Sequence, residues 1–237
     1  MIRYLVSLAL AFAYASHGSA FAATHDVEAV IVTSAGPAAR SFPSGTELRF
    51  GQIVGVGDRS TMTVLTNGEL LQWRGPGTYT IEESDDPPLD LVEVIEHPTF
   101  QGREPYDHRS VLLVSISAQH VCFWSGRELQ IPRSETAGMN AWMESVDGTG
   151  GRQTLAGSLP FVGFEDRDTS IWNIGVSDGG MRRLTVHRLN FDESAGTVVE
   201  LFSMMLDAGC HDQAHALAEN VSDLSDPQPN MRHGVVR

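Results

Sequence analysis

Residues 196–224 read GTVVELFSMMLDAGCHDQAHALAENVSDL, and this stretch predicts two helices joined by a tight turn. Apolar side chains recur at helical spacing from Val198 to Leu206 and again from Ala214 to Val221. Gly209 separates the two runs, and glycine readily adopts the left-handed conformation that ends a helix. We therefore expect a C-terminal helical hairpin.

The cysteine in this turn predicts a link to the middle of the chain. Cys122 and Cys210 are the two cysteines of the sequence, and an even pair in an oxidising compartment favours a disulfide. A helical wheel places Cys210 on the buried stripe of the second helix, where a strand bearing Cys122 could meet it. The bond would close a loop of about 90 residues, which contributes about 4–5 kcal/mol in the chain-entropy model. Two buried free thiols are the alternative.

The stretch HDQAH, from His211 to His215, differs by one methylene from the HExxH zinc motif. In that motif two histidines one helical turn apart bind zinc and the acid activates water. The wheel places both histidines at the polar edge of the helix, and no third ligand is clear, although His233 or Asp223 could be proposed. We expect a solvated helix face with no metal or other cofactor. A zinc-dependent hydrolase that uses His211 and His215 is the alternative.

The residues before the hairpin, 110–189, predict a second β-rich region. Ser110–Ala118 and His120–Trp124 are apolar enough for core strands, and Thr169–Ser177 and Arg182–Leu189 alternate apolar with polar side chains. An Asp-Gly-Gly sequence between the last two is typical of a hairpin turn. No stretch alternates strand with helix, which argues against a parallel α/β sheet.

Gly175–Gly179 reads GVSDG and matches the GxSxG nucleophile elbow of hydrolases. The elbow requires a strand before the serine and a helix after it, so that the hydroxyl projects at a helix N-terminus. Alternating residues of another strand follow here, so a hairpin turn explains the glycines better. We expect no catalytic residue in this segment, and we predict that the chain is not an enzyme.

From Val27 to Ile81 about six short apolar runs alternate with turn residues, which predicts a small β barrel or sandwich. Asn67-Gly68 is the strongest hairpin signal, and we expect a type I′ turn with positive φ at both residues. Gly75-Pro76-Gly77 predicts a bend into one last strand.

The four tryptophans are the candidate ligand contacts, because their rings could stack on sugars. Burial in the core is expected for Trp124 and Trp172, and Trp142 is left open. Trp73 stands with Arg74 beside the Gly-Pro-Gly bend. We expect this pair to be displayed at the surface as the leading contact residues.

The stretch from Ser44 to Ile81, SGTELRFGQIVGVGDRSTMTVLTNGELLQWRGPGTYTI, resembles the FecR-like domain of bacterial envelope proteins. That family repeats GxxLxxGxxV, followed by a strand, a turn and a closing strand. The matching positions are Gly45, Leu48, Gly51, Val54, Val64 and Gly68.

The resemblance covers residues 27–82 approximately and implies a periplasmic β module. In this family such modules are often tied to sigma-factor regulation through a membrane helix, which we do not expect here, so the chain is closer to secreted members without that helix. The stretch AGCHDQAHAL is similar to the helical ending of uncharacterised secreted proteobacterial proteins that have a Gly-Cys turn before Gln-Ala.

Residues 82–109 change in character and predict an acidic linker. Seven acidic residues and two prolines lie between Glu82 and Glu96, and Leu91, Val92 and Ile95 would form one face of a brief helix. The expected organisation is a signal peptide at 1–22, a FecR-like β domain at 23–81, the linker at 82–109, a β-rich domain with the helical hairpin at 110–224, and a flexible tail at 225–237.

The first residues, MIRYLVSLALAFAYASHGSAFAA, predict a cleavable signal peptide. Arg3 provides a positive n-region, Tyr4–Ala15 is an apolar run, and Ala20-Phe21-Ala22 fits the cleavage pattern. Twelve helical residues span about 18 Å, which is short of the ~30 Å hydrocarbon core, although an uncleaved anchor is the alternative. No later run approaches eighteen apolar residues, so we expect a periplasmic protein with no transmembrane helix after cleavage.

The chain is acidic, with 30 Asp and Glu against 16 basic residues, and all of the basic residues are arginine. Its formal charge of −14 repels nucleic acid and anionic lipid headgroups. The missing lysine excludes Schiff-base chemistry and phosphate loops that need an ammonium group. We therefore expect an exported, mainly β, non-enzymatic module of the cell envelope, either binding or structural, whose partner is an envelope protein or a glycan.

Overall fold

The computed structural model describes residues 27–82, 88–97, 99–100, 108–109, 111–112, 115, 117–125, 127, 129–130, 141–148, 151–155, 168–176 and 180–225. Over these residues the chain is mainly β with a C-terminal pair of helices, as predicted. The predicted signal peptide and all but the first residue of the predicted tail lie outside the described residues.

Six strands occupy the N-terminal region, as the turn pattern predicted. They are β1 (Ala29–Ala35), β2 (Glu47–Leu48), β3 (Ile53–Val56), β4 (Thr61–Thr66), β5 (Leu70–Arg74) and β6 (Gly77–Thr80), with a 3-10 helix η1 (Gly36–Arg40) after β1. One sheet has the order β2-β1-β4-β5, and β3 pairs with β6 in a second sheet. Both sheets contribute to one core that includes Ile31, Val54 and Val64, so this region is a sandwich and not a closed barrel.

The second β region is a five-stranded sheet with the order β11-β10-β12-β13-β9. Its strands are β9 (His120–Phe123), β10 (Ala141–Ser145), β11 (Arg152–Thr154), β12 (Thr169–Val176) and β13 (Gly180–Arg188), and a separate pair is formed by β7 (Thr99–Phe100) and β8 (His108–Arg109). All pairs in the five-stranded sheet are antiparallel except β13 with β9, which is parallel. The described residues of 110–118 lie in turns or irregular segments, so the strand predicted there is not found at them.

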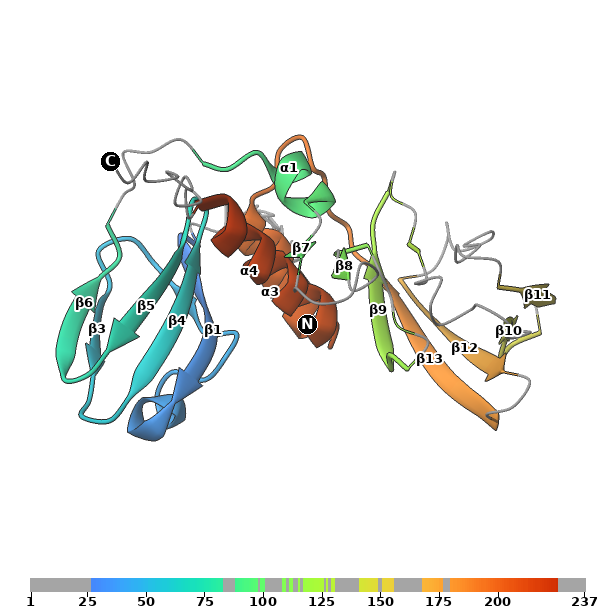
Figure 1. The fold of residues 1–237 in the computed structure, drawn as a ribbon, viewed down its shortest axis with the longest axis horizontal. Helices are drawn as coiled ribbons and strands as arrows, with labels where there is room; N and C mark the ends of the chain where they lie inside the picture. Colours follow the sequence, from blue (N-terminus) through green and yellow to red (C-terminus); the bar gives the residue numbers. More distant parts are fainter. Residues whose placement is uncertain are drawn as a thin grey trace, which may run out of the picture.

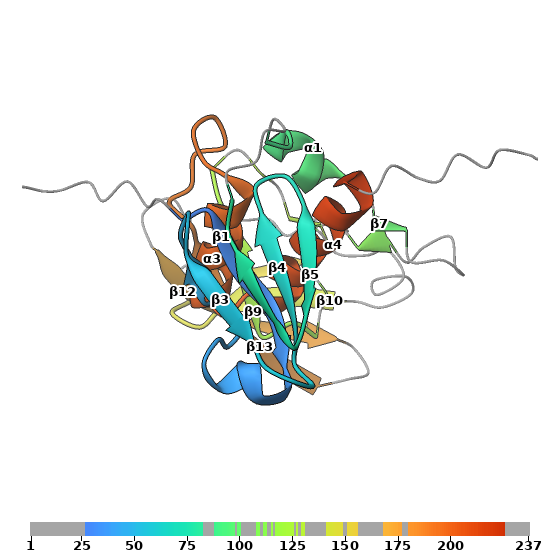
Figure 2. The ribbon, with the colours of Figure 1, turned by 90° about the vertical axis from the view of Figure 1, so that its left-hand side faces the viewer.

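The helices are α1 (Leu91–Glu96), α3 (Val198–Asp207) and α4 (His211–Ser225). The turn between α3 and α4 contains Gly209 with φ of 81°, as the glycine signal predicted. Figures 1 and 2 show both helices between the two β regions, with α1 beside them. The hairpin is thus a central layer that both β regions share, and not a cap on the second region alone. Among the described residues, no helix is long and apolar enough to cross a membrane.

Strand β1 is buried on both faces, which explains its unbroken run of apolar residues. Ala29 and Ile31 point into the sandwich core, whereas Val30 and Val32 belong to the core that the helices form. On the neighbouring strand β4, Val64 and Leu65 divide in the same way. The N-terminal sheet therefore packs the apolar part of one face against the helices, while Thr61 and Gln72 on the same face are exposed.

The β4–β5 hairpin lies at the predicted place, but its turn is of another type. The Thr66 amide donates to the Glu69 carbonyl over 2.9 Å, which closes the two-residue connection. Positive φ occurs at neither Asn67 nor Gly68, so the type I′ prediction is wrong. The side chain of Asn67 accepts from the Val199 amide at the start of α3, at 3.3 Å. Docking against this helix accounts for a turn that local propensity does not predict.

The predicted brief helix is present as α1, with one correction to its buried face. Leu91, Val94 and Ile95 are buried, whereas Val92 is 40% exposed. Positions three and four apart share a helix face, so Val94 follows Leu91 and Val92 turns outward. The Asp90 side chain caps the helix by accepting from the Val92 amide at 2.9 Å. The segment read as a linker thus contributes to the central core.

Candidate functional site

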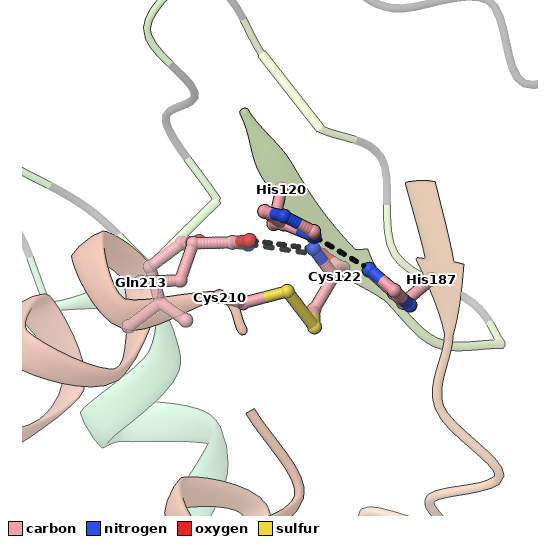
Figure 3. Close-up of a disulfide and its surroundings, with 6 residues drawn as sticks. His120, Cys122, His187, Cys210 and Gln213 are labelled. Atoms are coloured by element: carbon pink, nitrogen blue, oxygen red, sulfur yellow. Dashed lines mark hydrogen bonds between the residues drawn. A yellow bond between two sulfur atoms is a disulfide. The ribbon is translucent and has the colours of Figure 1, made fainter. Parts of the chain in front are cut away.

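The predicted disulfide between Cys122 and Cys210 is present, with a Cα–Cα distance of 5.9 Å. Cys122 lies on β9 and Cys210 lies at the turn between α3 and α4, and both are buried. Figure 3 shows the bond bridging the edge of the second sheet and the helical layer. The disulfide therefore joins two layers of the fold.

The side-chain amide of Gln213 also joins these layers, because it forms hydrogen bonds to the edge of β9 as the backbone of a neighbouring strand would. Its carbonyl oxygen accepts from the Cys122 amide at 2.7 Å, and its nitrogen donates to the Cys122 and Val111 carbonyls, both at 2.9 Å (Figure 3). Gln213 is 4% exposed, so each of these groups would otherwise be buried without a partner. Sequence reasoning missed it, although its place near the apolar stripe of α4 was a signal.

A pair of histidines lies beside the disulfide on the two parallel strands. His120 Nδ1 and His187 Nε2 are 3.0 Å apart, and the two rings lie within 17° of parallel (Figure 3). His120 is exposed and His187 is partly buried. Burial lowers the pKa of His187, and the neighbouring His120 lowers this pKa further. No sequence signal could have paired residues 67 positions apart on strands whose parallel pairing was not predicted.

A second polar cluster ties the end of α1 to the connections that follow β9 and β13. Arg127 binds both carboxylate oxygens of Glu193 at 2.7 Å and also pairs with the exposed Glu96. The indole nitrogen of Trp124 donates to the same Glu193 carboxylate. Arg127 holds the pKa of Glu193 below its ordinary value, and the paired carboxylates raise the pKa of Arg127. This cluster holds structure together, because every charged group has a partner.

His211 and His215 are exposed on α4, as the helical wheel predicted. Within the described residues, no group of three or more His, Cys, Asp or Glu side chains is close enough to hold a metal ion. His233 lies outside the described residues, and Asp223 is exposed two turns further along the helix. The structure thus brings no third ligand to this pair from the part of the chain that it describes.

Trp73 is not displayed at the bend, contrary to the expectation. It is 5% exposed, belongs to the sandwich core and stacks on Tyr79 with ring centroids 4.9 Å apart. The Tyr79 hydroxyl donates to the Arg74 carbonyl at 2.6 Å, so Arg74 is held at the strand end by its backbone while its side chain is exposed. A Cβ at Gly75 would lie 1.8 Å from the Gly57 carbonyl oxygen, so the Gly-Pro-Gly segment is a close turn between strands.

A cavity of about 430 Å³ lies at the Asn67–Gly68 turn. Glu28, Glu69 and Glu82 line it and are exposed, so its mouth is acidic. The Asn67 carbonyl already accepts from the Leu89 amide at 3.1 Å, and its side chain is bound to α3. The polar groups of the turn are therefore committed to the fold.

The GxSxG segment lies in a hairpin, because β12 is followed directly by β13 and not by a helix. Gly175 is a strand residue of β12, and Ser177 lies outside the described residues. The requirement for a helix after the serine is thus not met.

The face of the five-stranded sheet opposite its core, which we call the outer face, carries exposed apolar side chains among the described residues. Strand register places two rows on it, Thr154-Trp142-Gly175-Met181 and Arg152-Glu144-Asn173-Arg183, and a third row of Ile171, Thr185 and His120. Met181 is 65% exposed and Ile171 is 42% exposed, and both arginines are exposed. The opposite end of the same face, at Cys122, is covered by the helices.

Trp142 is the most specific feature of the outer face. The guanidinium carbon of Arg152 lies 3.5 Å from the centroid of its ring, a cation–π contact. A Cβ at Gly175 would lie 2.2 Å from the indole, so only glycine leaves room for the ring against the sheet. Trp142 and Arg152 therefore form one stacked unit that is held flat on the strands.

Comparison with known proteins finds no matching family model, curated protein or solved structure. The likeness of residues 27–82 to FecR-like domains therefore stays a prediction. Among the described residues, these sites divide into junctions that hold the layers together and one sheet face on which Met181, Ile171 and two arginines are exposed.

Proposed function

We propose that the chain is an exported, non-enzymatic protein of the periplasm that binds another envelope protein through its outer face. The exposed Met181 and Ile171, which lie on the same face as the Arg152–Trp142 unit, carry this proposal. Methionine, tryptophan and arginine are the residue types enriched in the cores of protein interfaces. Buried by a partner, these groups would supply apolar area around a pre-organised arginine.

The Arg152–Trp142 unit favours a protein over a glycan as the partner. A sugar ring stacks on an open aromatic face, but the guanidinium group of Arg152 lies over this ring. Arg152 and Arg183 offer donors to carboxylates or backbone carbonyls of a partner. The rings of Trp73, Trp124 and Trp172 are buried, so they cannot stack on a sugar.

The Cys122–Cys210 bond supports the proposal of export. Structural disulfides persist in oxidising compartments and are rare in the cytosol. The predicted signal peptide agrees with this compartment. Fractionation of cells that produce the full chain tests the location: recovery of the protein with its leader removed from the periplasmic fraction is expected, and recovery with free thiols from the cytosol contradicts it.

Site-specific photo-crosslinking tests the binding face. A photoreactive amino acid replaces Met181, and the matched control carries it at Gln72, which is exposed on β5 of the other β region. We expect a protein adduct from position 181 and none from position 72. An adduct whose added mass is removed by glycosidase, or equal adducts at both positions, overturns the proposal. Amine-reactive reagents cannot replace this test because the chain has no lysine.

A further inference from the structure

We propose that His120 and His187 form a binding site for a divalent transition-metal ion, and for Cu²⁺ in preference to Zn²⁺. The site uses none of the residues that carry the interface proposal above, although His120 lies on the same outer face, in the row of Ile171 and Thr185. It lies on the parallel strands β9 and β13, next to the disulfide, and its residues differ from the His211–His215 pair of α4 that the sequence singled out.

The separation of the two ring nitrogens fits two neighbouring ligands of one metal ion. His120 Nδ1 and His187 Nε2 are 3.0 Å apart. Two nitrogens at about 2.0–2.1 Å from a metal and at about a right angle are roughly 2.9 Å apart, whereas a tetrahedral angle separates them by about 3.3–3.4 Å. Right-angled coordination is typical of Cu²⁺ and Ni²⁺, and tetrahedral coordination is typical of Zn²⁺.

The rings meet edge to edge, so the metal would take the place of a shared proton. Their centroids are 5.3 Å apart while the two nitrogens are 3.0 Å apart, and the planes are within 17° of parallel. One ring must therefore donate an N–H to the lone pair of the other. On metal binding that proton moves to the other nitrogen of its own ring, and both imidazoles bind in their neutral form. The exposed His120 ring turns to direct its lone pair at the ion.

The fold fixes the backbone of both ligands before any metal arrives. His187 aligns with Cys122 in the strand register, and Cys122 is held by the disulfide and by Gln213. The His120 ring packs against Gly209 of the α3–α4 turn, where a Cβ would lie 3.4 Å from its Cγ. A site supported by its surroundings loses little entropy when it binds.

The chemistry of the donors selects the metal. Two imidazole nitrogens supply borderline ligands, and the exposure of His120 leaves the remaining positions to water. The thiols are consumed in the disulfide and cannot compete for the ion. At a site of nitrogen ligands, Cu²⁺ binds more tightly than the other divalent ions of its row.

Copper titration of the purified, oxidised chain tests the site. Every protein in the test, wild type included, carries His25→Gln. Cleavage after Ala22 would leave a free amino terminus with histidine as the third residue, and such a terminus is itself a strong Cu²⁺ chelator. The test variants are His120→Gln and His187→Gln, and the matched control is the double variant His211→Gln/His215→Gln. Calorimetry measures the affinity for Cu²⁺ and for Zn²⁺, electron paramagnetic resonance reports nitrogen coordination, and circular dichroism with mass analysis verifies the fold and the disulfide.

We expect one Cu²⁺ at this site with two nitrogen ligands, and tighter binding of Cu²⁺ than of Zn²⁺. The exposed His211–His215 pair offers a second set of two imidazoles, and the double variant removes any Cu²⁺ bound there. Loss of a supporting group weakens a metal site by roughly 10–100-fold, and either single variant should weaken the affinity for Cu²⁺ by more than this because it removes a ligand. The control variant should leave the affinity of this site unchanged. If His187→Gln does not fold, the exposed His120→Gln variant decides the outcome. Unchanged affinity in His120→Gln, loss of binding only in the control, or a preference for Zn²⁺ overturns the proposal.

Discussion

The two β regions are joined to the same pair of helices in different ways. The N-terminal sheet contributes Val30, Val32 and Leu65 from its strands to the helical core. Among the described strand residues of the second sheet, Cys122 alone is buried in that core, and the other contributions come from segments beyond the strand ends. One region is therefore attached through a packed apolar face, and the other is attached at a few points.

The difference matters because the two kinds of attachment respond to different conditions. Apolar packing depends on shape and area and is insensitive to redox state and to pH near neutrality. A disulfide is broken by reductant, and a buried side-chain amide is destabilising when its hydrogen-bond partner is lost. An ion cluster is weakened by acid. We therefore expect the second sheet to loosen before the N-terminal sandwich under each of these changes.

Removing the disulfide should have the largest effect on stability. The Cys122→Ala/Cys210→Ala variant should lose about 4–5 kcal/mol of unfolding free energy, because the bond closes a long loop in the unfolded chain. Urea unfolding measures the loss, and reduced wild-type protein serves as the reference. Hydrogen exchange should show lost protection in β9 and β13 before β1 and β4. Equal loss in both regions would contradict the comparison.

Leu65→Ala should cost about 2–4 kcal/mol, because it leaves a cavity between the N-terminal sheet and the helices. The matched control is Val64→Ala, which removes a side chain from the opposite face of the same strand. Hydrogen exchange should report loosening of α3 in Leu65→Ala but not in Val64→Ala. A variant pair with identical exchange patterns would show that this face is not the attachment.

Gln213→Leu should cost about 2–3 kcal/mol, because it leaves the Cys122 amide and two carbonyls buried without partners. Gln72→Leu, at an exposed position of β5, is the control and should change stability by less than about 0.5 kcal/mol. Urea midpoints at constant pH measure both effects, and a neutral result for Gln213→Leu would assign the junction to the disulfide alone.

Glu193→Gln should have the smallest effect, about 1–2 kcal/mol at neutral pH, and the effect should depend on pH. Arg127 lowers the pKa of Glu193 in the folded state, so its stabilisation is complete above the ordinary pKa of 4.5 and is lost as pH falls through the folded value. The gap between wild type and variant in urea unfolding should therefore narrow as pH falls below 4.5. Glu47→Gln, exposed on β2, should show no such dependence; a gap that persists in acid would assign the effect to packing.

Short-range patterns predicted much of the architecture. The helical pair, the Gly209 turn and the six N-terminal strands follow from periodicity and glycine placement. The wheel of α4 also predicted which side chains are exposed, because a helix repeats every 3.6 residues whatever it packs against.

Predictions that depended on the surroundings were wrong or absent. Trp73 is buried because Tyr79 stacks on it across the Gly-Pro-Gly turn, which exposure rules for a loop do not reveal. Gln213 and the His120–His187 pair acquire their roles from strand β9, whose neighbours were unknown. The role of a polar side chain can be recognised only when its hydrogen-bond partner is known.

Strands β10 and β11 were not predicted from the sequence. Local patterns did predict the C-terminal helices, the N-terminal strands and, with two cysteines and one inward-facing position, the disulfide. These features depend on local geometry and on a small number of alternatives. The tertiary structure alone decided that the helices form a layer between two sheets and that β9 runs parallel to β13. Those contacts join residues far apart in the chain, and many pairings of the same segments satisfy the local patterns equally well.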